Sequence, residues 1–593
     1  MNSAWATLRE RGLAVHGIGI ASFVSFLACF FVLIHRYFPA VGHDYHLFFG
    51  ELLEGKWQFH HFGLAIPRYA LHLCGGSVLY GNPQDMYYSL AQMLALVLGP
   101  WPAIQVAILV SMVAGYMGWY RVGRELMGLP SPWSHVMALV VLSNGFYFAH
   151  VAAGHVTFHA FALLGWFFLL LFERTELPLR TSVIARASSF ALLCAYVLYS
   201  GNWIVLLYLT MGFCLVLPLD IFLADRRRDR LVQLALRCAI FGAAALAIMG
   251  SKLVAIYSFM RFFPRESPIM AQDPSYSALG YIAKALWWIP QNGQLLATMA
   301  PSYVHEKTVL ISPVTWIGLV LGLVLLVRSI RNSTGKERAT RLVFAVVYGG
   351  AVLFTMIQLV RGYGWIAEAF HRLPVGASQR ASSRYLYLLS LVLSLAGVWS
   401  VAKAMGAFKR SWNILGMVAA SLATVAAFVF GYAGMMSEFG FWPNANDHRD
   451  LWWKFDPSIP VTSVVEGTDF VAGTGRTCYE PVLNAASDPF SILHVGPVSD
   501  QENGQFNLMN PACYQYPTEN HCKPGDRISV GDGDNLTRFT AGLPVTWEVS
   551  RAQQIADLVS AFSLVLLFLA PWYSARLSRR RSARVSAEAT FPS

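Results

Sequence analysis

Charged residues are scarce in this sequence, and their scarcity excludes an ordinary soluble fold. Asp, Glu, Lys and Arg make up 13% of the 593 residues, whereas 55% are hydrophobic. A soluble globular domain carries about 25% charged residues. Most of the chain must therefore be solvated by lipid, and we expect an all-α polytopic membrane protein.

The sequence also lacks motifs for binding nucleic acids or nucleotides. The net charge is +11, yet the basic residues lie between apolar stretches, where they orient helices. No glycine-rich phosphate-binding motif occurs, and the short basic segments are too small to hold an ATP site. We therefore expect no nucleic-acid partner, and any energy must come from a preactivated substrate or a gradient.

Cysteine is rare as well, with eight residues in the chain. Those within apolar stretches are expected to be packing residues; they are Cys29, Cys194, Cys214 and Cys238. Three others, Cys478, Cys513 and Cys522, share one polar segment. This pattern predicts one disulfide and one spare thiol, and the sequence leaves the pairing open.

Apolar stretches of ~20 residues recur along the chain, which is the length that a helix needs to cross ~30 Å of hydrocarbon. The first stretch, Gly17–Phe38, is too long for a signal-peptide core and lacks a small-residue cleavage site, so we expect it to be retained. The sequence predicts about twelve spans. They lie at 17–38, 101–120, 132–150, 157–173, 187–200, 203–223, 235–259, 314–330, 342–360, 385–404, 413–435 and 554–573.

The connections between these helices differ in their content of Lys and Arg. Every second connection is short and basic, so the positive-inside rule places these connections and both termini in the cytoplasm. The long segments, 39–100, 260–313, 361–384 and 436–553, then lie on the opposite side.

This pattern divides the chain into four parts. Residues 1–435 form the transmembrane module, 436–553 an extracytoplasmic domain, 554–573 the last span, and 574–593 a basic tail expected to be disordered.

Two of the outer segments carry further structural signals. Residues 436–553 are rich in Gly, Pro, Asn and Asp and predict a small mixed or β-rich domain. Its β-like runs are Val461–Val465, Phe490–Val495 and Arg527–Val530. In the first outer segment, Phe62–Leu79 has an amphipathic pattern and is expected to lie along the membrane interface.

An acidic residue follows the first helix on the outer side. Asp44 lies between His43 and His46, and a carboxylate beside two histidines can act as a general base or hold a metal ion. The alternative is a solvated loop with interfacial aromatic residues. Three further outer positions carry polar groups in other loops: the turn with Asn82 and Gln84, His155 after Gly154, and Glu306 beside Lys307. Each also has a structural explanation, as a turn, an interfacial histidine or an exposed ion pair.

Cationic side chains near the outer face indicate an anionic ligand. Lys252 lies inside an apolar helix, where a charge is expensive and normally faces a cavity or a partner, with snorkelling to the interface as the alternative. Arg380 and Arg384 are four residues apart and share a helical face. Outer arginines oppose the usual charge bias, and guanidinium groups bind phosphate oxygens through paired hydrogen bonds.

These motifs together resemble the GT-C class of membrane glycosyltransferases, in particular the bacterial YfhO-like branch, over about residues 40–400. The resemblance is carried by Asp44, the Gly75-Gly76-x-x-Leu79-x-x-Asn82-Pro83-Gln84 turn, Gly154-His155, Lys252, and Arg380-x-x-x-Arg384. The sequence differs from the family pattern at two points. A paired acidic motif is reduced to one Asp, and the arginine motif reads Ala-Ser-Ser where Pro is common.

The resemblance implies transfer of a sugar from a polyprenyl-phosphate donor to an extracytoplasmic acceptor, such as a cell-envelope glycan, lipid or protein. It implies that Asp44 is the catalytic base or a metal ligand, and that Arg380, Arg384 and Lys252 hold the donor phosphate. Donor or acceptor contacts are expected from His43, His46, Asn82, Gln84, His155 and Glu306. A divalent cation, Mg or Mn, would bind Asp44 with His43 and His46.

The implied setting is the lipid bilayer of a bacterial inner membrane, with the active site facing the periplasm or the cell exterior. A single displacement would invert the anomeric carbon of the sugar. Two other functions stay open: a transporter or flippase for a lipid-linked glycan, and a polymer-assembly component whose exported domain binds a glycan. A transporter would favour internal repeats and midplane charges, and the sequence shows no convincing repeat.

Overall fold

The computed structural model describes most of the chain, with gaps. The described residues are 2–37, 44–70, 77–173, 179–264, 271–273, 277–287, 304–307, 309–373, 376, 379, 381–438, 470–471, 474–475, 501–540, 543, 545 and 547–589.

Within these residues, ten helical stretches are long and apolar enough to cross a membrane. They are formed by α1 (Asn2–Tyr37), α4 (Pro100–Arg121), α5 (Ser131–Leu142) with α6 (Gly145–Ala153), α9 (Trp203–Phe222), α10 (Arg227–Met260), α14 (Pro313–Asn332), α15 (Gly335–Arg361), α18 (Leu386–Met405), α19 (Arg410–Glu438) and α23 (Arg551–Ala589). Two predicted spans correspond to shorter apolar helices, Val156–Phe172 and Val183–Tyr199. The chain is therefore an all-α, multi-pass membrane protein.

The remaining described elements lie between and beside these spans. The helical ones are α2 (Tyr45–Phe62), α3 (Leu90–Ala95), η1 (Val122–Leu126), η2 (Val156–Leu163), α7 (Leu164–Phe172), α8 (Leu179–Tyr199), α11 (Ala278–Leu286), α13 (Val304–Lys307), α16 (Trp365–His371), η3 (Ser382–Tyr385), α21 (Pro511–Gln515), η5 (Val530–Asp532) and α22 (Gly533–Thr540). The strands are β1 (Tyr69–Ala70), β2 (Ser77–Val78), β3 (Phe470–Val471), β4 (Thr474–Gly475), β5 (Gln501–Glu502), β6 (Gln505–Met509) and β7 (Arg527–Ser529).

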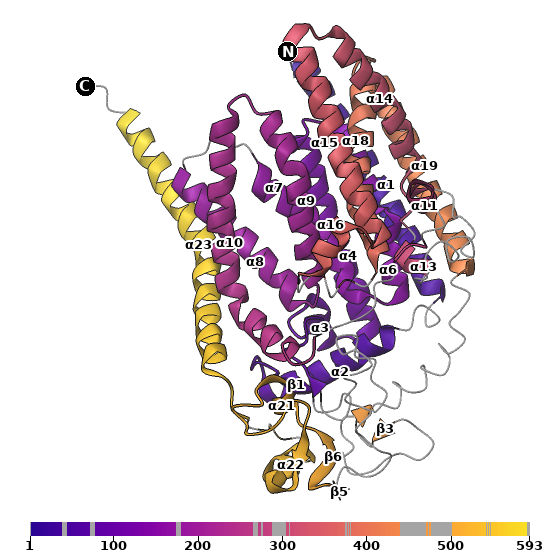
Figure 1. Ribbon diagram of the computed structural model, residues 1–593. Coiled ribbons are helices and arrows are strands. Elements are labelled where there is room, and N and C mark those ends of the chain that lie inside the picture. The colour runs from indigo at the N-terminus through magenta and orange to yellow at the C-terminus, as the bar shows by residue number, and fades with distance from the viewer. Residues whose placement is uncertain are drawn as a thin grey trace.

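Helices α1, α4, α18 and α19 pack against α5, whereas α10, α8 and α23 pack against one another. Figure 1 shows the N-terminus and the C-terminal end of α23 at one end of the bundle, with α21, α22, β5 and β6 at the other. The stretch Ser131–Ala153 is buried along its whole length. Small residues bring other helices close: a Cβ on Gly318 of α14 would lie 2.0 Å from the carbonyl oxygen of Gly397 in α18. Such residues let helix backbones approach within the membrane, where no hydrophobic effect drives their association.

The first outer segment differs from the sequence prediction. The helix there is α2, Tyr45–Phe62, whereas the stretch Phe62–Leu79, expected to lie along the membrane interface, contains strands β1 and β2. Gly63 ends α2 with a positive φ of 61°, and its N–H donates to the carbonyl of Phe59. Pro67 follows four residues later and opposes a continued helix.

The C-terminal tail also differs from the prediction, since α23 continues as a helix to Ala589. Extending an existing helix costs little, and Arg and Ala are good helix formers, so the basic composition did not require disorder. In Figure 1 α23 lies beside α10 and α8.

A small antiparallel sheet, β5-β6-β7, lies in the predicted exported domain. Strand β7 confirms the expected run at Arg527–Val530, whereas Val461–Val465 and Phe490–Val495 lie outside the described residues. The disulfide joins Cys513 to Cys522, which settles the pairing that the sequence left open. Cys478 lies outside the described residues.

Candidate functional site

Six ionisable side chains from distant parts of the chain form one cluster, which we call the central cluster. They are Asp44, His150, His155, His305, Glu306 and Arg384. Asp44 precedes α2, the two histidines flank the end of α6, His305 and Glu306 lie in α13, and Arg384 lies in η3 at the start of α18. Figure 1 shows α6 and α13 side by side.

Asp44 and His155 make the first contact of the cluster. Nε2 of His155 lies 2.8 Å from Oδ2 of Asp44, and both side chains are largely buried. The Tyr45 hydroxyl donates to the carbonyl of Val151 at 2.6 Å, which fixes the start of α2 against α6. A carboxylate held by an imidazole in this way is oriented to accept a proton from a substrate hydroxyl.

Gly154 explains why a glycine precedes His155. Its φ is +96°, and a Cβ there would lie 2.6 Å from the Tyr45 nitrogen and 3.1 Å from the Asp44 Cβ. Glycine is thus required both for the left-handed backbone and for the close approach of Asp44.

We expect Gly154→Ala to displace Asp44 from His155 and to lower any activity of the site at least ~10-fold, with a loss of stability of ~1–3 kcal/mol. Activity and thermal unfolding of the purified protein measure the two effects. Gly128→Ala is the matched control, because Gly128 also has a positive φ, +64°, but its added Cβ would meet nothing within 4 Å. It should lose ~1–2 kcal/mol and keep its activity. Equal loss of activity in both variants would contradict the role of Gly154.

Glu306 and Arg384 form the second part of the cluster. Nε of Arg384 donates to Oε2 of Glu306 at 2.6 Å, and Nη2 donates to Oε1, so the pair is bidentate. Burial alone would raise the pKa of Glu306. The charge and the hydrogen bonds of Arg384 outweigh burial and hold the pKa of Glu306 well below the usual range. Glu306 is therefore a carboxylate at neutral pH.

The hydrogen bonds of His150 indicate a cation at this cluster. Its Nδ1 lies 2.8 Å from the Phe146 carbonyl, and its Nε2 lies 3.2 Å from Oε2 of Glu306. With Nδ1 protonated toward the carbonyl, a neutral His150 presents a lone pair at Nε2 to a carboxylate. A metal ion bound to both groups would satisfy this arrangement, and a backbone partner on the second nitrogen is usual for metal-binding histidines.

His150, His155 and Glu306 can hold a metal ion, because one ligand atom from each lies within 4.8 Å of the others. Nδ1 of His155 is buried and has no hydrogen-bond partner among the described residues, so its lone pair is available when Nε2 donates to Asp44. The expected metal set was Asp44 with His43 and His46. His43 lies outside the described residues, the side chain of His46 is not described, and Asp44 reaches this set through His155.

Lys252 lies apart from these contacts. Its Nζ is 3.0 Å from Oδ2 of Asp85, and both side chains are fully buried. Asn82 and Gln84 belong to the turn that carries Asp85, where the Asn82 side chain accepts from the Gln84 N–H at 2.8 Å. Arg380 lies outside the described residues. The structure thus gathers Asp44, His155, Glu306 and Arg384 and places Lys252, Asn82 and Gln84 elsewhere.

Sequence reasoning missed His150 and His305. Both are buried, and their rings lie 5.6 Å apart between centroids. His150 lies inside an apolar run, and an ionisable residue within a membrane span is itself a functional signal. His305 directly precedes Glu306 and had no signal of its own.

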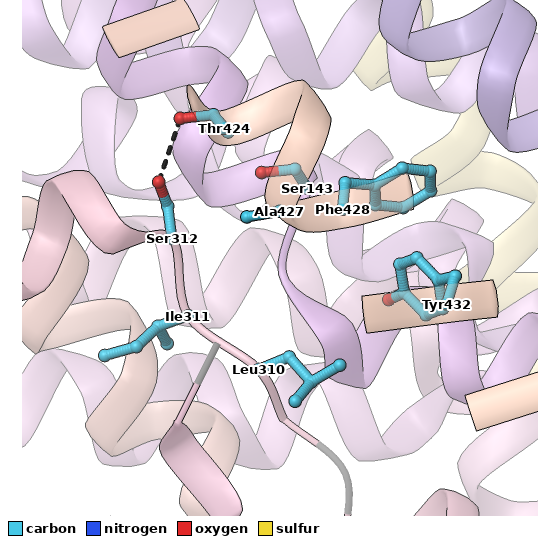
Figure 2. A pocket seen from close by; sticks show the side chains of 8 residues that line it. All are labelled: Ser143, Leu310, Ile311, Ser312, Thr424, Ala427, Phe428 and Tyr432. Atoms are coloured by element: carbon cyan, nitrogen blue, oxygen red, sulfur yellow. Dashed lines mark hydrogen bonds between the residues drawn. The ribbon is translucent and has the colours of Figure 1, made fainter. Parts of the chain in front are cut away.

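The segment after α13 anchors Glu306 to the bundle. Figure 2 shows a pocket between this segment and α19, lined by Ser143, Leu310, Ile311, Ser312, Thr424, Ala427, Phe428 and Tyr432. The Gly145 N–H donates to the Leu310 carbonyl at 3.2 Å, and the Tyr432 hydroxyl donates to the Gly145 carbonyl at 3.1 Å. The first bond holds the segment against the start of α6, the helix that carries His150, and the second joins α19 to the same residue of α6.

The fold of this chain is similar to that of a solved structure, whereas its sequence gives no match. No protein-family model and no curated protein matches the sequence. Among solved structures, the chain is similar to the cryo-EM structure of the arabinofuranosyltransferase AftD from Mycobacteria, with a TM-score of 0.40 and 13% identity. The match covers 78% of this chain and 30% of that one, so this chain spans less than a third of its length. A likeness at this level says nothing about substrate or activity.

Proposed function

We propose that this chain is a GT-C membrane glycosyltransferase that moves a sugar from a polyprenyl-phosphate donor to an acceptor outside the cytoplasm. One observation carries the proposal: a carboxylate, Asp44, and a guanidinium, Arg384, belong to one buried cluster beside the ends of several membrane spans. The membrane would be a bacterial inner membrane, with the cluster facing the periplasm or the cell exterior.

The proposed reaction is a single displacement. Asp44 removes the proton of the acceptor hydroxyl, whose oxygen forms a bond to the anomeric carbon as the bond from that carbon to the phosphate oxygen breaks. The polyprenyl phosphate leaves with the electron pair, and the anomeric carbon is inverted. Arg384 stabilises the charge that grows on the departing phosphate. Nη1 of Arg384 makes no hydrogen bond to a described residue, so it is placed to contact a substrate oxygen.

The charge of the cluster indicates that a further cation is needed. With neutral histidines, Asp44 and Glu306 carry two negative charges, and Arg384 carries one positive charge. A phosphate would add negative charge, so a second cation must offset it; Arg380 and a divalent metal ion are the candidates. A metal held by His150, His155 and Glu306 would supply electrostatic stabilisation of the phosphate, and imidazole ligands favour Mn over Mg.

Metal dependence can be tested directly. Chelation with EDTA is expected to lower transfer at least ~10-fold, and Mn²⁺ should restore it better than Mg²⁺. His150→Ala should weaken Mn²⁺ binding to the protein, measured by elemental analysis after dialysis. His159→Ala is the matched control, since His159 is also buried but its Nε2 bonds Tyr196 at 2.9 Å, outside the cluster. Full activity after chelation, with no metal bound to the protein, would exclude a metal ion. Arg380 would then be the second cation that offsets the phosphate charge.

The buried ion pair with Asp85 gives Lys252 a partner other than phosphate. We therefore assign the donor phosphate to Arg384 and Arg380, and the contacts with the sugar or acceptor to residues near Asp44, including His43 and His46; His155 orients Asp44.

The proposal is tested by incubating the purified full chain in lipid nanodiscs with a panel of polyprenyl-phosphate sugars and candidate acceptors. Mass spectrometry should detect free polyprenyl phosphate together with a glycosylated acceptor for at least one donor. In sealed proteoliposomes, movement of an intact donor across the bilayer with no cleavage would instead support the flippase alternative.

A further inference from the structure

The pair Lys252–Asp85 is a buried ion pair outside the central cluster. Lys252 lies within the span formed by α10, and its Nζ is also 4.9 Å from the centre of the Tyr80 ring. The side-chain exposures are 0% for Lys252 and 1% for Asp85. A buried pair is weak support for stability, because apolar residues of similar size often serve as well, but it can fix one arrangement of the groups it joins. This pair joins the last span on one side and the loop of His155 on the other.

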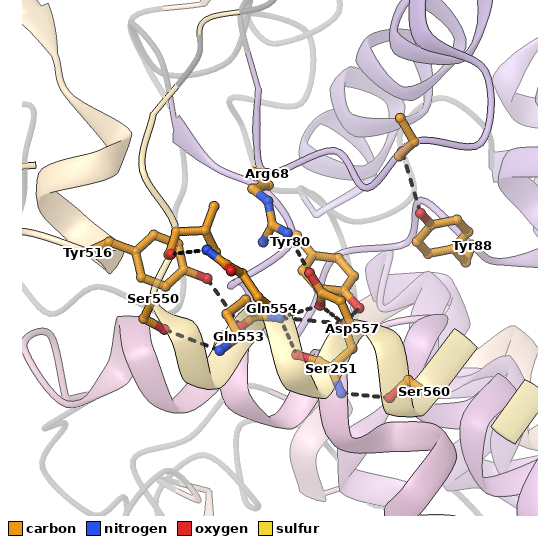
Figure 3. A network of polar contacts seen from close by, with 12 residues as sticks. Arg68, Tyr80, Tyr88, Ser251, Tyr516, Ser550, Gln553, Gln554, Asp557 and Ser560 are labelled. Carbon is orange, nitrogen blue, oxygen red and sulfur yellow. Dashed lines mark hydrogen bonds and ion pairs between the residues drawn. The ribbon is translucent and has the colours of Figure 1, made fainter. Parts of the chain in front are cut away.

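On one side the pair adjoins the last span. Ser251, next to Lys252, donates from Oγ to Oδ1 of Asp557 at 2.5 Å, and its backbone N–H donates to Oγ of Ser560 at 2.9 Å. Oδ2 of Asp557 accepts from Arg68 at 2.6 Å. Figure 3 shows this network, with Gln553, Asp557 and Ser560 of α23 facing Ser251. The hydroxyl of Tyr80 lies 2.6 Å from Oγ of Ser251, so one network holds α23, α10 and the start of the turn that carries Asp85.

On the other side the pair leads toward His155. The carbonyl oxygen of Gln84, adjacent to Asp85, packs against Gly201, where a Cβ would lie 2.2 Å from it. The next residue, Asn202, donates from its side chain to the carbonyl of Thr157. Thr157 is two residues beyond His155 and lies in η2, directly after the loop that holds His155 against Asp44.

We propose that the Lys252–Asp85 pair positions the Asp44–His155 contact. The pair holds the turn at Asn82–Asp85 against α10, this turn supports Gly201–Asn202, and Asn202 fixes the loop that carries His155. Lys252 and Asp85 are positioning residues that touch no substrate, and Ser251 extends their support to α23. The positioning role rests on the proposed function only for its effect on transfer, because the contact itself exists without substrate.

The first test measures how well the Asp44–His155 contact is held, and it needs no activity assay. The full chain in nanodiscs is treated with diethyl pyrocarbonate, and the labelling rate of each histidine is followed by mass spectrometry. Lys252→Met and Asp85→Asn should each raise the rate at His155 about tenfold, because a loosened loop opens more often. The exchanged variant, Lys252→Asp with Asp85→Lys, should return it toward the wild-type rate. His521 is exposed outside the candidate membrane spans and should label equally in all proteins.

Arg230→Met is the matched control for a lost buried ion pair in the same helix. Arg230 lies near the other end of α10 and pairs with Asp220 at 2.6 Å, with side-chain exposures of 6% and 12%. This variant should lose stability, yet its labelling rate at His155 and its kcat should stay at the wild-type values. Lys252→Met should lower kcat about tenfold with little change in the KM for the donor, because the substrate-binding groups remain in place.

Labelling of His155 at the wild-type rate in both Lys252→Met and Asp85→Asn, with stability lost as in Arg230→Met, would overturn the proposal. If the charge variants do not fold, Asn202→Leu tests the same path, since it keeps the ion pair and replaces the donor to Thr157 with an uncharged side chain of similar size; an unchanged rate there also overturns it. Suppose instead that both charge variants raise the labelling of His155, but that neither they nor the wild type transfers sugar from any donor. This result would support the positioning role of the pair and contradict only the proposed function.

Discussion

Replacing Asp44 with Asn is expected to lower the rate of sugar transfer ~100-fold or more while leaving the protein folded. Asn has the same shape as Asp and its side-chain oxygen can still accept from Nε2 of His155, so the local packing survives. It cannot take a proton from the acceptor, and a positioned general base contributes ~10²–10⁴-fold. The measurement is the initial rate of polyprenyl phosphate release with saturating acceptor, alongside the thermal unfolding midpoint.

A second acid, in the helix that follows Asp44, provides the control for Asp44. Glu54 is buried in α2 and accepts from Gln58 at 2.8 Å, outside the central cluster. Glu54→Gln makes the same chemical change and should keep transfer within a few-fold of wild type. An Asp44→Asn protein that transfers sugar at the wild-type rate would remove Asp44 as the base and leave the function without its proton acceptor.

Replacing Arg384 with Met should produce the largest loss of stability, ~3–5 kcal/mol, together with loss of transfer. The substitution leaves Glu306 buried without its bidentate partner, and an uncompensated buried charge is costly. The pKa of Glu306 is held well below its usual range, so the stabilisation by the pair is complete near pH 7. It is lost progressively as the pH falls from the ordinary pKa of a glutamate down through that lowered pKa. Chemical unfolding in detergent and the transfer assay measure the two losses.

The double variant Arg384→Met with Glu306→Gln separates the two roles of Arg384. Removing both charges should restore most of the stability, since no unpaired charge remains, but transfer should stay lost because no guanidinium faces the phosphate. Glu306 is also a proposed metal ligand, so Glu306→Gln alone measures the part of the loss that comes from the metal ion. Recovery of transfer along with stability would show that Arg384 serves only to neutralise Glu306. The phosphate role would then pass to Arg380.

The helices were largely predictable because membrane spans need apolar runs of fixed length. The predicted span at 314–330 corresponds to α14 at Pro313–Asn332, and the one at 203–223 corresponds to α9 at Trp203–Phe222. α2 was not predicted, because its buried face mixes Phe48 and Leu52 with Glu51 and Glu54 and so lacks a clean apolar stripe. A helix of this kind is recognised only when its acidic residues have partners in the fold.

The candidate site was predictable in part. Asp44, His155, Glu306 and Arg384 each have a local signal, and the structure brings them together. The contacts themselves were not predictable, because Glu306 could bond Arg384 or its neighbour Lys307, and only the packing of α13 on α6 and η3 decides. For the same reason the partner of Lys252 was hidden, since Asp85 lies in a turn far away in the sequence.

The most direct test of the proposed function determines on which side of the membrane the donor is cleaved. Proteoliposomes of known protein orientation would receive a short-chain, non-crossing polyprenyl-phosphate sugar on one side only, with acceptor on both sides. We expect release of polyprenyl phosphate only when the donor is added to the face that carries Asp44 and Arg384, and no release by Asp44→Asn. Cleavage only from the face that carries Arg226 and Arg228, or equal cleavage by Asp44→Asn, would contradict the proposed function.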